Sequence, residues 1–229
     1  MLAAVLPLLL AACAAPPALP TAAQLDILIP GGGLGPASPG GDWVLAGVGN
    51  GETAPRLTPV QIDGVPAMRV AAGEGRLTAL RQVRAPLLAT PFLTWSWHVS
   101  PTRAAAHPVH LVAGFQSVAE PAAAQRRQSA TAPLPAHDRQ VTLVFAASAL
   151  QRGSLARLEG PADGGVYTVR GGPENADTWW VETVDLEDLY RRLWPTDDPA
   201  WVEVVFIGVQ AEPASGGQAA NLSGILLSR

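Results

Sequence analysis

The sequence predicts an all-β fold, mainly antiparallel, and three observations support this. Residues 92–100 read Phe-Leu-Thr-Trp-Ser-Trp-His-Val-Ser, so that apolar and small polar side chains alternate. Successive side chains of a strand point to opposite sheet faces, which places Trp95 and Trp97 in a core and His98 on a wetter face. Residues 109–116 repeat the alternation, and 23 Gly and 22 Pro supply turns between short strands. We therefore expect a β-sandwich.

Length and charge restrict the organisation and the partners. A chain of 229 residues is compatible with a single large β-sandwich domain, and 48% hydrophobic residues are enough for one core. The net charge is −4, every basic residue is Arg, and no basic stripe is present. Nucleic acid is therefore excluded as an expected partner.

The remaining strands are predicted from short apolar runs between turn signals. Asp63-Gly64 is the strongest hairpin signal, since a tight turn there needs positive φ. Residues 117–138 have no period and form an excursion, for which disorder and a functional loop are both open. Residues 150–163 are expected to be a loop. The other predicted strands are residues 25–29, 43–46, 60–62, 67–71, 75–83, 140–146, 166–169, 179–184, 202–209 and 222–227.

One short amphipathic helix is predicted after Asp185, which suits the N-cap position, and Pro195 ends it. The acidic first turn and the basic last turn complement the helix dipole. Its apolar side chains recur at helical spacing on one face: Leu186, Leu189, Tyr190, Leu193 and Trp194.

The N-terminal residues suggest a cellular location for the protein. Residues 1–12 are apolar but too short to cross a bilayer, and they end in Leu-Ala-Ala before Cys13, the only cysteine. This resembles the lipobox of bacterial lipoproteins, which implies a signal peptide over residues 1–12 and a lipid on Cys13. Residues 13–23 are rich in Ala and Pro and predict a tether, leaving residues 24–229 as the folded domain. The alternative is that Cys13 is an ordinary thiol.

Three segments together carry a resemblance to a protein family. They are Leu-Thr-Trp-Ser-Trp-His-Val at 93–99, the strand at 109–116, and the block 180–194, which reads Trp-Val-Glu-Thr-Val-Asp-Leu-Glu-Asp-Leu-Tyr-Arg-Arg-Leu-Trp. The chain resembles the exported bacterial family called domain of unknown function 3047. That resemblance implies a jelly-roll-like sandwich similar in shape to carbohydrate-binding modules, and it implies no activity. The chain departs from the family at Ala106-His107 and His110, where the family tends to have an acidic pair and an Arg.

Candidate binding residues follow from the aromatic pattern. Adjacent residues of a strand face opposite ways, so one indole of Trp179-Trp180 should pack inward. We expect Trp180 to be the packed one and Trp179 to offer a flat surface to a sugar ring or a partner. Four further residues complete the set of candidate ligand contacts: Trp43, Trp201, His98 and His110.

The sequence favours a binding protein over an enzyme. His107 and His110 have metal-ligand spacing, but on a strand they would face opposite sides, so neither a metal nor a cofactor is expected. A glycan hydrolase using a carboxylate pair is the alternative function, with Glu182, Asp185, Glu187 and Asp188 as its carboxylates. The interpretation adopted is an outer-membrane lipoprotein facing the periplasm, which is either a module that binds a ligand such as a glycan or an envelope protein, or a structural module of the envelope.

Overall fold

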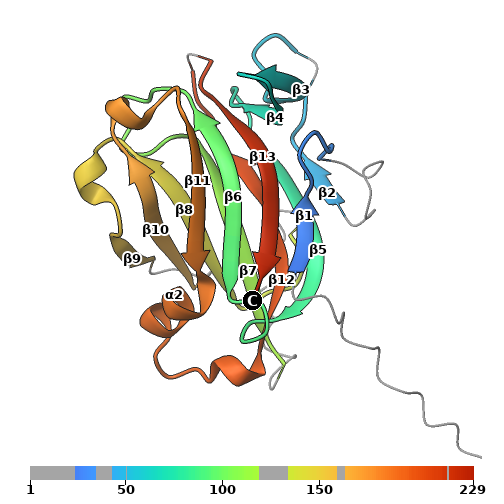
Figure 1. Ribbon diagram of the computed structural model, residues 1–229, viewed down its shortest axis with the longest axis vertical. Helices are drawn as coiled ribbons and strands as arrows, with labels where there is room; N and C mark the ends of the chain where they lie inside the picture. The colour runs from blue at the N-terminus through green and yellow to red at the C-terminus, as the bar shows by residue number, and fades with distance from the viewer. Residues whose placement is uncertain (1–23, 35–42, 50, 119–133, 159–162, 216) are drawn as a thin grey trace, which may run out of the picture.

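A computed structural model describes residues 24–34, 43–49, 51–118, 134–158, 163–215 and 217–229. The predicted signal peptide, Cys13 and the tether lie outside these residues, as does much of the excursion predicted for 117–138. The described chain forms two facing β-sheets (Figure 1). The predicted, mainly antiparallel β-sandwich is therefore confirmed.

The front sheet, which faces the viewer in Figure 1, has six strands. Its order is β11-β6-β13-β4-β3. The first half of β13 pairs with β4, and its second half pairs with β1. The strands are β1 (Gln24–Leu28), β3 (Arg56–Ile62), β4 (Val65–Ala71), β6 (Phe92–Val99), β11 (Trp179–Asp185) and β13 (Ala219–Ser228).

The back sheet has seven strands in the order β2-β5-β12-β7-β8-β10-β9. It is antiparallel except where β10 pairs with β8 in parallel. The strands are β2 (Trp43–Ala46), β5 (Leu77–Pro86), β7 (Val109–Ser117), β8 (Arg139–Ala146), β9 (Leu155–Leu158), β10 (Gly164–Gly171) and β12 (Val202–Ala211).

One local prediction was wrong. Residues 150–163 were expected to be a loop, but they contain the edge strand β9, which pairs with the N-terminal half of β10. Short 3₁₀ helices lie at Ala149–Gln151, Pro173–Asn175 and Pro199–Trp201. Because β9 has only four residues and no clear alternation, its pairing with β10 identifies it where its sequence does not.

The core lies between the sheets and is centred on β6. Trp95 and Trp97 are buried, and their rings meet edge to face at 5.5 Å. Trp97 also contacts Phe145 of the back sheet, with ring centroids 6.0 Å apart. The predicted alternation is confirmed, because Thr94 and its outward neighbours are only partly buried. Burial of large aromatic side chains contributes about 2 to 3 kcal/mol each, so β6 fixes how the two layers face each other.

The predicted helix is α2 (Leu186–Leu193), and it closes one end of the sandwich. The Asp185 side chain accepts a hydrogen bond from the Asp188 amide at 3.0 Å, as an N-cap does. Tyr190 packs edge to face on Phe115, with centroids 5.3 Å apart, and Trp194 Nε1 donates to Asp163 at 2.9 Å. None of the described helices has the length and apolar character needed to span a bilayer.

The strand registers define two ends of the sandwich. At the lower end in Figure 1, Gln24 pairs with Ser228, which pairs in turn with Phe92 of β6. The upper end holds the other end of β6, where His98 pairs with Trp179 and with Asn221. The N-terminal segment therefore joins the fold at the lower end, and the aromatic pair His98–Trp179 lies at the upper one.

Candidate functional site

A row of polar and aromatic side chains crosses the outer face of the front sheet at its upper end. Strand register places Thr58 of β3 opposite Arg69 of β4, Arg69 opposite Asn221 of β13, Asn221 opposite His98 of β6, and His98 opposite Trp179 of β11. Directly opposed residues in antiparallel strands have Cβ atoms about 5 Å apart. Side chains from five strands thus form one continuous line, which we call the upper row.

The β3–β4 hairpin forms a wall over this row. Its turn has the predicted Asp63-Gly64 sequence, with φ of 52° and 80°, as a type I′ turn requires. Beyond the residues that pair with β13, the hairpin reaches back across the sheet face, because Ser223 Oγ donates to Pro66 O at 2.8 Å. Trp179 Nε1 donates to Ile62 O at 3.2 Å. The indole is therefore held at its nitrogen and partly exposed elsewhere.

His98 and Trp179 support each other at one end of the row. Their rings meet edge to face, with centroids 5.7 Å apart. Asn221 donates from Nδ2 to His98 O at 3.2 Å, while its own Oδ1 is buried and has no hydrogen-bond partner in the described part of the chain. An unsatisfied buried acceptor costs about 1 to 3 kcal/mol, so this amide oxygen lowers the stability of the fold at the centre of the upper row.

At the other end of the row lies a pocket of about 500 Å³, within the usual range for small-molecule sites. Arg69 and Thr58 line it together with Arg56. Arg56 donates from Nη2 to Glu52 O at 2.6 Å. Within the described ranges Arg69 makes no hydrogen bond or ion pair, so its donors are available. The loops that complete the wall contribute Thr53, Ala54, Glu74, Ala214 and Ser215.

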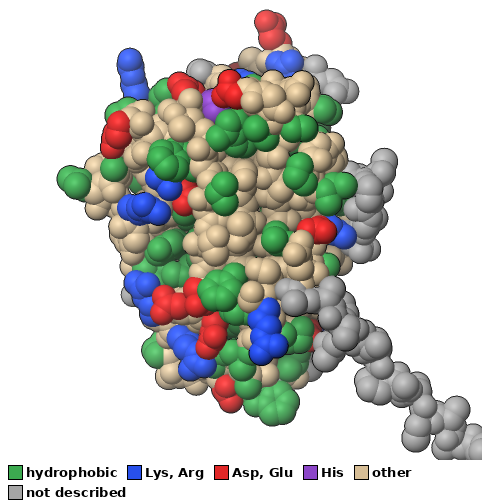
Figure 2. All heavy atoms as spheres, in the orientation of Figure 1, with side chains coloured by type: hydrophobic (Ala, Val, Ile, Leu, Met, Phe, Trp, Pro, Cys, Tyr) green, Lys and Arg blue, Asp and Glu red, His purple; other side chains and the backbone are tan. Residues whose placement is uncertain are grey.

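A smaller pocket of about 270 Å³ lies lower on the same sheet face. Its polar lining comes from Asp26, Thr94, Ser96 and Ser223. Figure 2 shows that the centre of this face is mostly backbone and small polar side chains, with few charges. The face thus offers a long surface of hydroxyl groups that ends in arginines and an indole.

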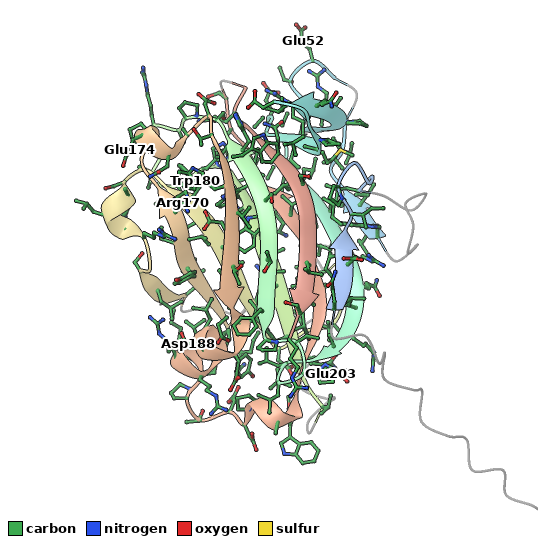
Figure 3. The ribbon with its side chains drawn as sticks, viewed as in Figure 1. Glu52, Arg170, Glu174, Trp180, Asp188 and Glu203 are labelled. Carbon is green, nitrogen blue, oxygen red and sulfur yellow. The ribbon has the colours of Figure 1, made fainter. Side chains whose placement is uncertain are left out.

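Trp180 packs against the core, as predicted, although its side chain is only half-buried, and it lies beside a buried ion pair. Arg170 of β10 and Glu182 of β11 meet between the sheets, and Trp97 Nε1 also donates to Glu182 at 3.3 Å. The Arg170 guanidinium lies over the Trp180 ring, 3.6 Å from its centroid (Figure 3). This cluster joins the two sheets and offers little surface to a ligand.

The four carboxylates considered for hydrolysis have structural contacts. Glu182 binds Arg170, and Asp185 caps α2. Glu187 pairs with Arg191 at 2.7 Å and Asp188 pairs with Arg192 at 3.2 Å, both one helical turn apart. Figure 3 shows Glu182's partner Arg170 in the sandwich and Asp188 on α2 at its lower end. The four groups therefore do not converge on one cleft.

The other candidate residues are dispersed. Trp43 is buried in the core, because its strand pairs with β5 and turns the indole inward, so it offers no stacking surface. Trp201 is 57% exposed but lies at the lower end. His110 is buried on the outer face of the back sheet, where it bonds Gln210, and burial lowers its pKa. Trp179 and His98 are the candidates that the structure brings together.

The predicted separation of His107 from His110 also agrees with the structure. His107 faces inward, and its Nε2 lies 3.3 Å from Ser100 Oγ. Burial lowers its pKa to about 4. Among the described residues no group of three or more His, Cys, Asp or Glu side chains is placed to hold a metal ion.

Sequence reasoning missed Arg56, Arg69 and Asn221. The two arginines lie in the β3–β4 hairpin and Asn221 lies in β13, so only the pairing of β4 with β13 brings them together and no local spacing joins them. A weak signal was present, since Arg69 interrupts an otherwise apolar strand on the side away from Met68 and Val70. That pattern indicated an outward guanidinium but not its neighbours.

Comparisons with known proteins give similarity of overall structure. Scans of the sequence against family models and curated proteins find no match. The structure is similar to endoglucanase 3 of glycoside hydrolase family 12 from Trichoderma harzianum, with a TM-score of 0.49 and 13% identity over 82% of this chain and 91% of that one. It is also similar to a family 30 carbohydrate-binding module from Clostridium thermocellum, with a TM-score of 0.43 and 13% identity over 90% and 96%.

A third similar structure is the family 11 carbohydrate-binding module from Clostridium thermocellum in complex with a β-1,3-1,4-mixed-linked tetrasaccharide. Its TM-score is 0.40 and its identity is 8%, covering 82% of this chain and 88% of that one. At such values no residue role passes from these proteins to this chain. The function is therefore argued from the upper row itself.

Proposed function

We propose that this protein binds a glycan along the outer face of the front sheet, and that it does so from the cell envelope. The upper row is the observation that carries the proposal. It combines an indole face at Trp179 with an unoccupied guanidinium at Arg69. Sugars present apolar ring faces and rows of hydroxyl groups, which match an aromatic platform flanked by donors and acceptors.

The shape of the site suits an extended ligand. The 500 Å³ pocket and the 270 Å³ pocket lie on the same sheet face. Beside the smaller pocket the face carries further hydroxyl groups, including Thr94 and Thr183, whose Oγ1 atoms lie 3.0 Å apart. An oligosaccharide of several units fits such a surface better than a compact ligand does.

The arrangement of the two carboxylates at the larger pocket suits binding better than hydrolysis. Glu74 accepts a hydrogen bond from Thr53 Oγ1 at 2.9 Å. Glu52 lies on the same pocket, but Figure 3 shows its side chain projecting from the upper end, away from the domain. A glycosidase needs two carboxyl groups facing each other across the scissile bond. These two carboxylates therefore support a binding role for the pocket.

The location is part of the proposal. A lipid on Cys13, with residues 14–23 as spacer, would hold the domain at the outer membrane and facing the periplasm. This rests on the signal-like residues 1–12 and on the Leu-Ala-Ala-Cys sequence. Intact-mass measurement of the wild-type chain and of Cys13→Ser tests it, because the acyl mass should be present in the first and lost in the second.

Calorimetric titration with oligosaccharides chosen from a glycan array tests the binding. Arg69→Ala should weaken the affinity at least about tenfold, as expected for loss of a charged hydrogen bond worth roughly 1.5 to 3 kcal/mol. Arg84→Ala is the matched control, because Arg84 is 80% exposed and pairs with Glu203 on β12 of the back sheet. Equal affinities for both variants, or no binding to any glycan, would overturn the proposal.

A further inference from the structure

An exposed apolar patch lies at the lower end of the sandwich, opposite to the upper row. It consists of Leu88, Phe92, Val118 and Trp201, which are 37 to 57% exposed, and we call it the end patch. Backbone hydrogen bonds connect the segments that carry these side chains, because Val118 N donates to Trp201 O at 2.8 Å and Leu87 N donates to Val202 O at 2.9 Å. Three separate segments thus present large apolar side chains at the same end.

The N-terminal segment enters the fold at this same end. Gln24 is the first residue of β1, it pairs with Ser228, and Ser228 pairs with Phe92 of the end patch. Figure 1 shows the start of β1, the C-terminus and the last 3₁₀ helix together at the lower end. The chain before Gln24 therefore joins the described domain at the end that carries the end patch.

The length of chain before β1 limits how far the domain can move from an anchor. Ten residues separate Cys13 from Gln24, and a chain of that length spans at most about 35 to 40 Å. A bilayer holding Cys13 would therefore remain within reach of the end patch. Trp side chains favour the membrane interface, where the ring is apolar and the N–H stays wet.

We propose that the end patch lies in the interface of the membrane to which Cys13 is anchored, and that it orients the domain. This rests on the anchor proposed above and is independent of glycan binding. His98 lies about 20 Å from Phe92 along β6, from the rise per residue of a strand. With the end patch on the lipid, the upper row points away from the bilayer, toward ligands of the periplasmic space.

Site-directed spin labelling tests this orientation. Acylation consumes the thiol of Cys13, so an introduced cysteine is the only free thiol of the mature chain. Leu88→Cys places a nitroxide in the end patch. Leu150→Cys is the matched control, because Leu150 is 97% exposed and follows β8 at the upper end. Both variants are made as the full acylated chain and reconstituted into vesicles of phosphatidylethanolamine and phosphatidylglycerol.

The label at residue 88 should be at least about fivefold less accessible to an aqueous nickel chelate than the label at residue 150, as expected for a group within the interface. Adding Trp201→Ser to Leu88→Cys should return much of that accessibility. Equal accessibility of the two labels would overturn the proposal. Protection of residue 88 in the vesicle-free Cys13→Ser chain would also overturn it, because the patch would then face a second copy.

The acyl mass and glycan affinity are measured on the same samples. A chain without an acyl group on Cys13 overturns the anchor and the orientation, while its glycan affinity remains a separate result. A chain that is acylated and protected at residue 88 but binds no glycan supports the orientation and contradicts the proposed function. The experiments therefore distinguish failure of the proposed membrane orientation from failure of the proposed glycan binding.

Discussion

Arg170 and Glu182 form an ion pair between the two sheets, and both side chains are more than nine-tenths buried. Arg170 belongs to β10 of the back sheet and Glu182 to β11 of the front sheet. Trp97 donates to the same carboxylate, and Trp180 stacks on the guanidinium. The pair thus determines how the strand that carries Trp179 is positioned over the core.

Removing one member of this pair should be costly. Glu182→Ala leaves the Arg170 charge buried without its partner, and we expect a loss of about 3 to 5 kcal/mol in the free energy of unfolding. The double variant Arg170→Met/Glu182→Leu should be much less damaged, since it removes both charges. Urea unfolding of the three proteins measures this, and a double variant less stable than Glu182→Ala would contradict the account.

The two kinds of tryptophan should differ sharply in their effect on stability. Trp97→Ala empties the centre of the core, for which we expect a loss of about 3 to 5 kcal/mol. Trp179→Ala removes a partly exposed ring and one hydrogen bond, which should cost roughly 1 to 2 kcal/mol. Denaturant midpoints at constant slope give both values. Similar losses for the two variants would show that Trp179 is a core residue.

Acid should destabilise the fold through His107. Burial lowers its pKa from 6.5 to about 4, so the unfolded chain binds a proton in a pH range where the folded chain does not. The contribution of neutral His107 to the free energy of unfolding is fully present above pH 6.5 and is lost as the pH falls toward 4. The free energy of unfolding falls by roughly 3 kcal/mol over this range. His107→Gln should flatten this part of the stability–pH curve. An unchanged slope between pH 6.5 and 4 would assign the loss elsewhere.

The cap of α2 gives a small and specific effect. Asp185→Ala removes the acceptor for the Asp188 amide and should cost about 1 kcal/mol. Asp185→Asn keeps an acceptor oxygen and should cost clearly less. Thermal unfolding distinguishes them, and equal losses would mean that the charge of Asp185, acting on the helix dipole, matters more than the hydrogen bond.

The sequence predicted the layers better than the site, for physical reasons. Period-two alternation is local, so it identified β6, β7 and the buried indoles of Trp95 and Trp97. The helix was equally clear, because its cap and its apolar face lie within ten residues. The same local pattern could not show that β2 pairs with β5, and so it left Trp43 open as a surface residue.

The upper row depends on strand order, which no local pattern contains. Arg69 and Asn221 are more than 150 residues apart in sequence and become neighbours only because β13 pairs with β4. Trp179 and His98 were chosen as separate candidates and meet because β11 pairs with β6. The parallel pairing of β8 with β10, and β9 beside it, also needed the assembled sheet.

Hydrogen exchange with and without a bound oligosaccharide tests the central claim most directly. The account predicts slower exchange of backbone amides in the β3–β4 hairpin and in the segment around Glu74 when the ligand is present, with no change in β8 and β10 of the back sheet. Protection confined to the back sheet, with an unaltered hairpin, would contradict a binding site on the upper row.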